Sequence, residues 1–314
     1  MKNYWFKLIT AATIAVGLSS CDLFSSDEIN DYLAEDGDAI ETFLETNNID
    51  YRRTTNGVRI VTLNPEDSSF IEGVDGNYAG NVLDIKFRRK LFASDKAEGL
   101  LIDKEAQSMT FYLSDQRTGG FIFGLSDGIT DMYMGEKAEL YIPSFYAYGS
   151  NSGTINGVSV PQNAIIRMEV EVEAARDTVT QKYYEATHIA QFMKDSLDIE
   201  NSSQYLLPYD DIYKVVTEAA EDSAQQVQEG DYITVDYTGK LLNGKVFDSG
   251  NEYKFFLNSS NFVKGWGISL KTMKVGETAT VLMPSHYGYG MTGASSIAPY
   301  SPLIFEITVK EIIN

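Results

Sequence analysis

Alternating apolar and polar residues predict strands in several parts of the chain. In residues 233–237 and 303–309, every second position is apolar, which is the period of a strand with one buried face. Residues 166–173 alternate in the same way, with charged residues between the apolar ones. The apolar positions are Ile166, Met168, Val170, Val172, Ile233, Val235, Tyr237, Leu303, Phe305, Ile307 and Val309. We expect these segments to pair in sheets that cover a core.

Other segments have their apolar residues at helical spacing. Residues 29–49 and about 183–197 each predict a helix, and residues 265–274 predict one short amphipathic helix. The apolar positions are Ile40, Phe43 and Leu44 in the first helix and Trp266, Leu270 and Met273 in the short one. Several antiparallel strands with a single short helix indicate an α+β fold, in which the sheet wraps around that helix.

Parts of the chain recur at a fixed distance, and the repeat predicts two homologous domains. The matching pairs are 121–140 with 262–281 and 142–149 with 283–290, at an offset of 141 residues, and 59–67 with 214–222, at an offset of 155. The larger upstream offset means that the first copy carries extra residues, which we place around 94–107. A helical segment precedes each copy.

The composition excludes some partners and cofactors. The net charge of −20 repels phosphate backbones, so we expect no nucleic-acid partner, and charge alone does not favour an anionic lipid surface. The two histidines, His188 and His286, are far apart in the sequence. No Cys, His or carboxylate spacing indicates zinc, so we expect neither a metal site nor a cofactor. We expect His188 to be a surface residue and His286 to have an ordinary polar role.

The N-terminal segment predicts export and a lipid anchor. Lys2 and Lys7 precede an apolar run from Leu8 to Leu18, which has the form of a secretory signal peptide and is too short to span a bilayer. The run ends in Leu-Ser-Ser before Cys21, which resembles a bacterial lipobox, so we expect lipidation of Cys21 after removal of residues 1–20. As the single cysteine of the chain, it cannot form an internal disulfide. The alternatives are an ordinary signal peptide or a buried free thiol.

Gly288, Gly290 and Gly293 match the glycine spacing of a dinucleotide-binding turn. Such a turn must open a helix whose N-terminus faces the pyrophosphate. Here residues 294–307 contain two prolines and then a strand pattern. The phosphate-binding interpretation is therefore rejected, and we expect these glycines to let the loop that carries Tyr289 turn, because glycine tolerates positive φ.

The second copy resembles an FKBP-type peptidyl-prolyl cis–trans isomerase domain over its whole length. The resemblance is carried, in order, by V-D-Y-T-G from Val235, V-F-D-S from Val246, G-W-x-x-x-L from Gly265, M-K-V-G-E from Met273 and P-S-x-x-x-Y-G from Pro284. It implies isomerisation of prolyl bonds in exported polypeptides, with no cofactor, and a pocket that accepts a macrolide ligand.

The resemblance also implies roles for individual side chains. Trp266 would form the pocket floor, Tyr289 would donate its hydroxyl to a substrate carbonyl, and Asp248 would orient polar contacts at the edge. Tyr237 is expected to act with Asp248 and Tyr289 in catalysis. The remaining substrate-binding residues would be Phe247, Tyr253, Phe262, Val263, Ile297 and Phe305. The alternative is that the aromatic residues are simply core, but Asp248 beside Phe247 has no reason to be there in a core.

The first copy departs from this pattern. Its counterpart of Tyr237 is Phe87, and Arg88 and Arg89 replace the Thr-Gly that follows. Leu125 replaces the floor tryptophan, and Met168 replaces Phe305. Tyr148 remains, but V-F-D-S is absent from the first copy, and the segment around Asp103 is the nearest substitute. We expect a weak or absent catalyst, kept for folding, binding or dimerisation.

The predicted organisation is a signal peptide (1–20), a tether and helix (21–56), a degenerate FKBP-like domain (57–175), a helical linker (176–209) and an isomerase domain (210–314). Two functions remain open. The first is a lipid-anchored foldase of the bacterial cell envelope, on the periplasmic side or in the outer membrane. The second is a non-catalytic chaperone or assembly lipoprotein that holds clients in its aromatic clefts.

Overall fold

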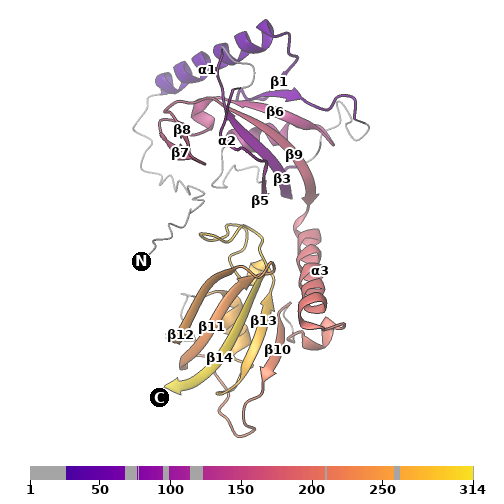
Figure 1. Ribbon diagram of the computed structural model, residues 1–314, viewed down its shortest axis with the longest axis vertical. Helices are drawn as coiled ribbons and strands as arrows, with labels where there is room; N and C mark the ends of the chain where they lie inside the picture. Colours follow the sequence, from indigo (N-terminus) through magenta and orange to yellow (C-terminus); the bar gives the residue numbers. More distant parts are fainter. Residues whose placement is uncertain are drawn as a thin grey trace. The chain divides into compact units, whose positions relative to one another are not determined.

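The computed structural model contains two compact units, which divide between Asp177 and Thr178 (Figure 1). In each unit, long antiparallel strands form the main sheet, as the alternation predicts. Side chains are described from residue 31 onward. The structure describes residues 26–67, 76, 78–94, 99–113, 123–208, 211–257 and 262–313.

The first unit is built on a sheet with the strand order β1-β2-β6-β9-β3-β4, and β5 also pairs with β3. A separate ribbon of two short strands, β7 and β8, follows the turn η1. The elements are α1 (Ser26–Thr46), β1 (Arg52–Arg53), β2 (Arg59–Thr62), β3 (Val82–Leu91), β4 (Leu100–Leu101), β5 (Gln107–Tyr112), α2 (Phe123–Thr130), β6 (Lys137–Ile142), η1 (Ser144–Tyr146), β7 (Gly153–Ile155), β8 (Val158–Val160) and β9 (Ile166–Arg176).

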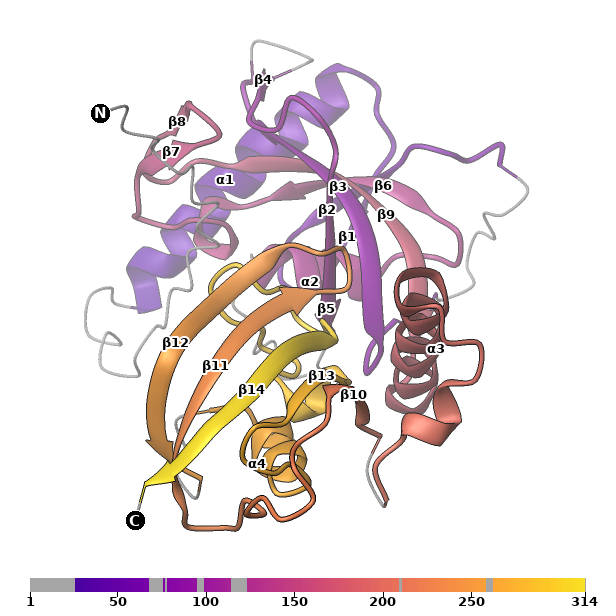
Figure 2. The ribbon, with the colours of Figure 1, turned by 60° about the horizontal axis from the view of Figure 1, so that its bottom comes forward.

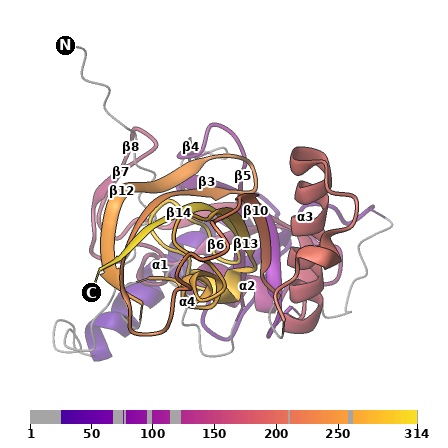
Figure 3. The ribbon, with the colours of Figure 1, turned by 90° about the horizontal axis from the view of Figure 1, so that it is seen from below.

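The second unit repeats this plan with the strand order β10-β13-β14-β11-β12. Figure 2 shows its long strands side by side, and Figure 3 shows α4 against the sheet. The elements are α3 (Thr178–Leu197), η2 (Ser202–Tyr205), β10 (Tyr213–Glu218), β11 (Tyr232–Leu241), β12 (Val246–Phe256), α4 (Lys264–Leu270), β13 (Thr278–Met283), η3 (Ser285–Tyr287) and β14 (Leu303–Ile313). The predicted short helix ends earlier than expected, at Leu270, although Met273 just beyond it is fully buried.

Each sheet carries a helix on both faces. In the second unit, Val281 and Met283 of β13 join the core that contains α4, whereas Leu282 between them packs with Ile189 and Met193 of α3. Successive residues of a strand point to opposite faces, so α3 covers the outer face. The helix α1 covers the first sheet in the same way. The segment expected as a linker is therefore packed within the second unit. Among the described residues, no helix has the length and apolar character that a membrane span requires.

The strand register defines which residues of the two copies correspond. Arg89 of β3 pairs with Met168 of β9, and Gly239 of β11 pairs with Phe305 of β14. Because Phe305 is the expected counterpart of Met168, Arg89 occupies the position of Gly239. The same register makes Phe87 the counterpart of Tyr237, as the repeat predicts.

The register corrects the offset for the first strand of each repeat. Arg59 pairs with Tyr141, and Tyr213 pairs with Leu282, which is 141 residues beyond Tyr141. Arg59 therefore corresponds to Tyr213 rather than to Lys214. The reason is an irregularity in β10 between Val216 and Glu218, since an extra residue there shifts the pairs before it by one.

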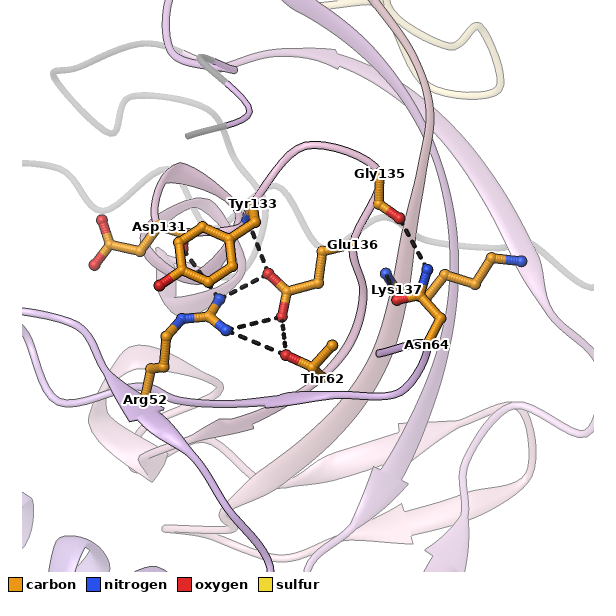
Figure 4. A network of polar contacts seen from close by, with 8 residues as sticks. All are labelled: Arg52, Thr62, Asn64, Asp131, Tyr133, Gly135, Glu136 and Lys137. Atoms are coloured by element: carbon orange, nitrogen blue, oxygen red, sulfur yellow. Dashed lines mark hydrogen bonds and ion pairs between the residues drawn. The ribbon is translucent and has the colours of Figure 1, made fainter. Parts of the chain in front are cut away.

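A buried glutamate holds the turn after the central helix in both copies. In the first copy, Glu136 accepts hydrogen bonds from the Tyr133 amide (2.8 Å) and from Arg52, which also lies 3.9 Å above the Tyr133 ring (Figure 4). In the second copy, Glu277 accepts from the Lys274 amide at 3.2 Å and from Lys214 at 2.8 Å. This shared contact explains why the glutamate recurs in the repeat, and it ties the turn to β1 in the first copy and to β10 in the second.

Candidate functional site

An aromatic cluster surrounds Trp266, the residue predicted to form the pocket floor. Trp266 lies on α4 and is 3% exposed. The centroid of its ring lies 4.9 Å from that of Tyr237, 5.3 Å from Phe305, 5.6 Å from Phe255 and 6.2 Å from Phe262. The first two rings meet it edge to face, a favourable arrangement for aromatic pairs. The central helix thus presents its indole to rings from three strands and a loop.

A second group of rings extends the cluster towards the Tyr289 loop. Phe247 meets Phe305 edge to face at 5.6 Å and Tyr289 at 6.4 Å. On the other side, Tyr253 lies 5.7 Å from Tyr237. The apolar residues Val263 and Ile297 pack against the same core. Every residue predicted for the pocket therefore belongs to this cluster or contacts it, although their roles stay predictions.

The polar edge of the cluster is formed by Asp248 and two tyrosines. Tyr237 donates its hydroxyl hydrogen to Oδ2 of Asp248 at 2.8 Å, and Oδ1 accepts from the Ser249 amide at 2.9 Å. Burial raises the pKa of Tyr237, and the hydrogen bond to Asp248 and its charge raise it further. Burial, followed by the charge of Asp248, also raises the pKa of Tyr289. Both hydroxyls are therefore protonated at neutral pH and are able to donate.

Trp266 also carries a buried donor. Its Nε1 has no hydrogen-bond partner in the described part of the chain. Leaving such a donor unpaired costs about 1–3 kcal/mol, and unpaired groups of this kind are uncommon in a purely structural core. This observation favours a functional pocket over the alternative that the rings are only core.

Gly239 makes room for two rings of the cluster. A Cβ atom at this position would lie 2.7 Å from the ring of Phe247 and 2.9 Å from the ring of Phe305. Contacts under 3 Å do not occur between real Cβ atoms and ring carbons, so only glycine lets Phe247 lie across β11.

The glycines of the Tyr289 loop serve two different purposes. Gly290 and Gly293 have φ values of 58° and 65°, as the prediction of a tight turn requires. Gly288 has a φ of −104°, so the expectation of positive φ is wrong there. At that position a Cβ would lie 2.6 Å from Leu303, and glycine is needed for space.

The first copy fills the equivalent site with an ion pair. Arg89, at the position of Gly239, donates from Nε to Oδ2 and from Nη2 to Oδ1 of Asp103, both at 2.8 Å. Its Nη1 donates to the hydroxyl oxygen of Tyr148 at 2.9 Å. Burial lowers the pKa of Arg89, but the contacts with Asp103 and Tyr148 outweigh it and raise the pKa overall. Arg89 thus occupies the position at which glycine leaves room for the Phe247 ring in the second copy.

The acid expected to be lost from the first copy is present. Leu101 pairs with Lys90 in the first copy, and Val246 pairs with Lys240, the corresponding residue of the second copy. Two residues further along the chain in each copy, Asp103 therefore lies at the position of Asp248. Asp103 is fully buried and also accepts from Asn156 at 2.6 Å. The extra residues before it displace it in the sequence, which indicated this segment only as the nearest substitute, and the register establishes the equivalence.

Among the described residues, Phe255 is the one aromatic neighbour of Trp266 that the sequence prediction missed. It is 6% exposed and lies 4.9 Å from Phe262 as well as against the indole. It stands two residues after Tyr253, and alternate residues of a strand share a face. That spacing was a signal that could have identified it.

The remaining predicted residues lie outside the cluster or outside the described part. His188 is exposed on α3. His286 is partly buried, and burial followed by the charge of Lys182 lowers its pKa. No group of three or more metal-binding side chains occurs among the residues that the structure describes. Cys21 and the predicted signal peptide precede residue 26 and are not described.

Curated proteins resemble this chain over much of its length. The rat protein named peptidyl-prolyl cis-trans isomerase FKBP9 is 27% identical over 221 residues, which are 69% of this chain and 33% of the rat protein. An Arabidopsis thaliana protein, peptidyl-prolyl cis-trans isomerase FKBP15-3, is 38% identical over 96 residues, which are 29% of this chain and 65% of its own. The chain spans about a third of the length of the FKBP9 relatives.

Solved structures and a family model complete the comparison. The crystal structure of the three FKBP domains of wheat FKBP73 covers 84% of this chain and 99% of its own, at 20% identity and a TM-score of 0.33. The sequence model of FKBP-type peptidyl-prolyl cis-trans isomerases matches residues 74–173 and 223–310. These regions lie one in each copy and together make up more than half of the 314 residues. This protein is therefore a member of the FKBP-type peptidyl-prolyl cis-trans isomerase family, and it carries the domain twice.

Proposed function

We propose that the second domain catalyses cis–trans isomerisation of peptidyl-prolyl bonds and that the first domain does not. The observation that carries this proposal is the buried indole of Trp266 with its ring of aromatic neighbours, edged by Asp248 and Tyr289. The site contains what a rotation of an amide needs.

Rotation about a prolyl bond must break amide resonance, a barrier of ~18–20 kcal/mol. A pocket of rings removes water from the planar amide, which is more polar than the twisted form and loses more by that removal. Donors that favour the twisted geometry lower the barrier further, because only interactions that are stronger in the transition state accelerate the reaction. No nucleophile or metal takes part in this chemistry.

Two tyrosines can supply and orient the polar contacts. The hydroxyl of Tyr289 makes no hydrogen bond with another described residue, and its raised pKa keeps the proton available for a substrate carbonyl. The hydroxyl of Tyr237 already donates to Asp248, so it holds the carboxylate at the pocket edge. The proline ring of the substrate would lie over Trp266.

The first domain has lost the aromatic floor, and its retained tyrosine and aspartate are engaged within the domain. Leu125 and Met168 stand at the positions of Trp266 and Phe305. The Tyr148 oxygen is engaged by Arg89, and Asp103 is paired and fully buried. A role in folding, binding or dimerisation is consistent with a stable, closed site.

The setting that we propose is the bacterial cell envelope. Support comes from the N-terminal sequence alone: two lysines, a short apolar run and Leu-Ser-Ser before Cys21. With lipid on Cys21, the domains would meet exported polypeptides as they fold. The aromatic pocket is also the part of the chain in which a macrolide ligand would bind, in competition with prolyl substrates.

Exchange spectroscopy of an Xaa-Pro peptide by NMR tests the proposal. We expect the full-length protein to accelerate cis–trans exchange, and Asp248→Ala to reduce the acceleration. Glu229→Ala is the matched control, because it removes the same charge from an acid whose side chain is 73% exposed. If the full-length protein did not accelerate the exchange, the proposal that it is an isomerase would be rejected. If the inactive protein still prevented an unfolded client from aggregating, the non-catalytic chaperone would be the better interpretation.

A further inference from the structure

A carboxylate from α3 reaches the loop that carries Tyr289. Glu185 is 3% exposed, and its Oε2 accepts a hydrogen bond from the Ser285 amide at 2.6 Å. Its Oε1 accepts from the Ser285 hydroxyl at 2.9 Å and from Nε2 of Gln181 at 3.0 Å. A buried carboxylate is costly unless donors satisfy it, and these three donors do so.

Ser285 connects Glu185 to the turn that carries Tyr289. Its carbonyl oxygen accepts from the amides of Gly288 and Gly290, both at 2.8 Å. These two glycines flank Tyr289 in the sequence, so Ser285 closes the turn that presents the tyrosine. The residue before Ser285 is Pro284, which offers no side-chain acceptor for the first amide of the turn. Glu185 takes over that role from a separate helix.

The first copy makes the same contact with a different acid. Asp36 of α1 is 9% exposed and accepts from the Ser144 amide at 2.7 Å and from its hydroxyl at 2.6 Å. The Ser144 carbonyl accepts from the amides of Ala147 and Gly149, on either side of Tyr148. Two acids of different length, from two different helices, thus produce one geometry. That recurrence favours a specific purpose over a chance surface contact.

Both helices lie outside the regions that match the family. The matches begin at residues 74 and 223, whereas α1 ends at Thr46 and α3 ends at Leu197. The helix α3 packs on the outer face of the sheet through apolar residues, with Ile189 and Met193 against Leu282. The position of Glu185 is therefore fixed by the core and does not depend on the loop that it binds.

We propose that Glu185 is a positioning residue for prolyl isomerisation: through Ser285 it holds the loop at the conformation in which the Tyr289 hydroxyl faces the substrate. This inference rests on the proposed function of the second domain. The unit that performs the reaction is then the family's domain together with α3.

A double-mutant cycle on full-length protein tests the positioning role. We expect Glu185→Ala to lower kcat/KM about tenfold, and Glu185→Gln to restore part of it because the amide oxygen can still accept from Ser285. In the background of Tyr289→Phe, where the positioned hydroxyl is absent, Glu185→Ala should change kcat/KM less than twofold. An equal loss in both backgrounds would overturn the proposal, since a purely structural role does not depend on the hydroxyl.

Asp36→Ala is the matched control. It removes the equivalent contact from the first copy, and we expect kcat/KM to stay within twofold of the unaltered protein. A tenfold loss in this variant would contradict a role specific to the Tyr289 loop.

Amide hydrogen exchange separates this inference from the proposed function. Glu185→Ala should accelerate exchange at Gly288 and Gly290 about tenfold or more, while amides of β14 exchange as before. If the full-length protein has no isomerase activity, the proposed function fails. The amide-exchange measurement still shows whether Glu185 holds the conformation of the Tyr289 loop. Unchanged exchange at the two glycines would overturn the role of Glu185 in either case.

Discussion

The two copies share a sheet, a central helix and a tyrosine loop, but at one position of the sheet the first copy has a charged residue and the second has a glycine. In the second copy, Gly239 leaves room for the ring of Phe247. In the first, Arg89 occupies the same position of the register and extends its guanidinium to Asp103. This difference adds to the loss of the aromatic floor from the first copy, so the second copy has an aromatic cluster here and the first has a closed ion pair.

The corresponding acids show how environment changes the use of a residue. Asp103 is fully buried and receives donors from Arg89 and Asn156, so it has a structural role. Asp248 is exposed and receives only the Tyr237 hydroxyl and the Ser249 amide among the described residues. It keeps free acceptor capacity at the edge of the pocket. A retained aspartate is therefore no sign of activity unless its surroundings are also retained.

The largest expected effect is on stability, and it lies in the first copy. Asp103→Ala leaves the Arg89 guanidinium without its carboxylate, and breaking a buried pair in this way costs ~3–5 kcal/mol. Asp248→Ala should cost less than about 1 kcal/mol, because that acid is exposed. Urea unfolding followed by circular dichroism measures both. Similar costs for the two variants would contradict the contrast between a buried pair and an open edge.

The next effect tests the glycine that separates the copies. Gly239→Ala places a Cβ against Phe247 and Phe305, and such overpacking costs ~1–3 kcal/mol. We also expect kcat/KM for a prolyl peptide to fall, since Phe247 must move. The fluorescence of Trp266 reports unfolding of this domain.

Gly267→Ala is the control for that substitution. Its Cβ would meet only the Phe262 ring, at an ordinary 3.9 Å. Stability and activity should change little. If the two alanines had equal effects, the space argument for Gly239 would be wrong.

A smaller effect follows from the hydroxyl that the first copy lacks. Tyr237→Phe, which copies Phe87, removes the hydrogen bond to Asp248 and should cost about 1 kcal/mol at pH 7. The folded state raises the pKa of Tyr237 above its ordinary value of 10.0. Its contribution is therefore complete below about pH 10 and is lost as the pH rises further, because the unfolded chain ionises first.

The stability gap between Tyr237→Phe and the unaltered protein should accordingly narrow above pH 10. Urea unfolding of both proteins at pH 7 and pH 10.5 measures the gap. A gap that widens with pH would mean that the folded state favours the ionised phenol, contrary to the burial and the neighbouring carboxylate.

The sequence was sufficient to predict the parts that depend on local patterns. Strand alternation in residues 233–237 and 303–309 and the helical spacing around Trp266 correspond to β11, β14 and α4. The repeat identified the two copies, and the family motifs led to residues that do come together around one indole. These signals are carried by neighbours in the chain or by ordered motifs.

Other features depend on contacts between distant residues and were not predictable. The sequence indicated Asp103 as the nearest substitute for the acid of the motif, but it did not predict the ion pair of Asp103 with Arg89. The contacts of Asp36 and Glu185 join residues 108 and 100 positions apart, and no motif contains both partners. The bulge in β10 likewise moved one strand by a residue. Register and burial, rather than composition, reveal these relations.

A matched pair of tyrosine variants tests the central claim most directly. Tyr289→Phe and Tyr148→Phe make the same change at the same position of the two copies, and kcat/KM for an Xaa-Pro peptide is measured for each full-length protein. We expect Tyr289→Phe to lose about tenfold, the equivalent of ~1.4 kcal/mol of transition-state stabilisation, and Tyr148→Phe to retain full activity. Loss of activity in Tyr148→Phe, with Tyr289→Phe unaffected, would contradict the assignment of catalysis to the second domain.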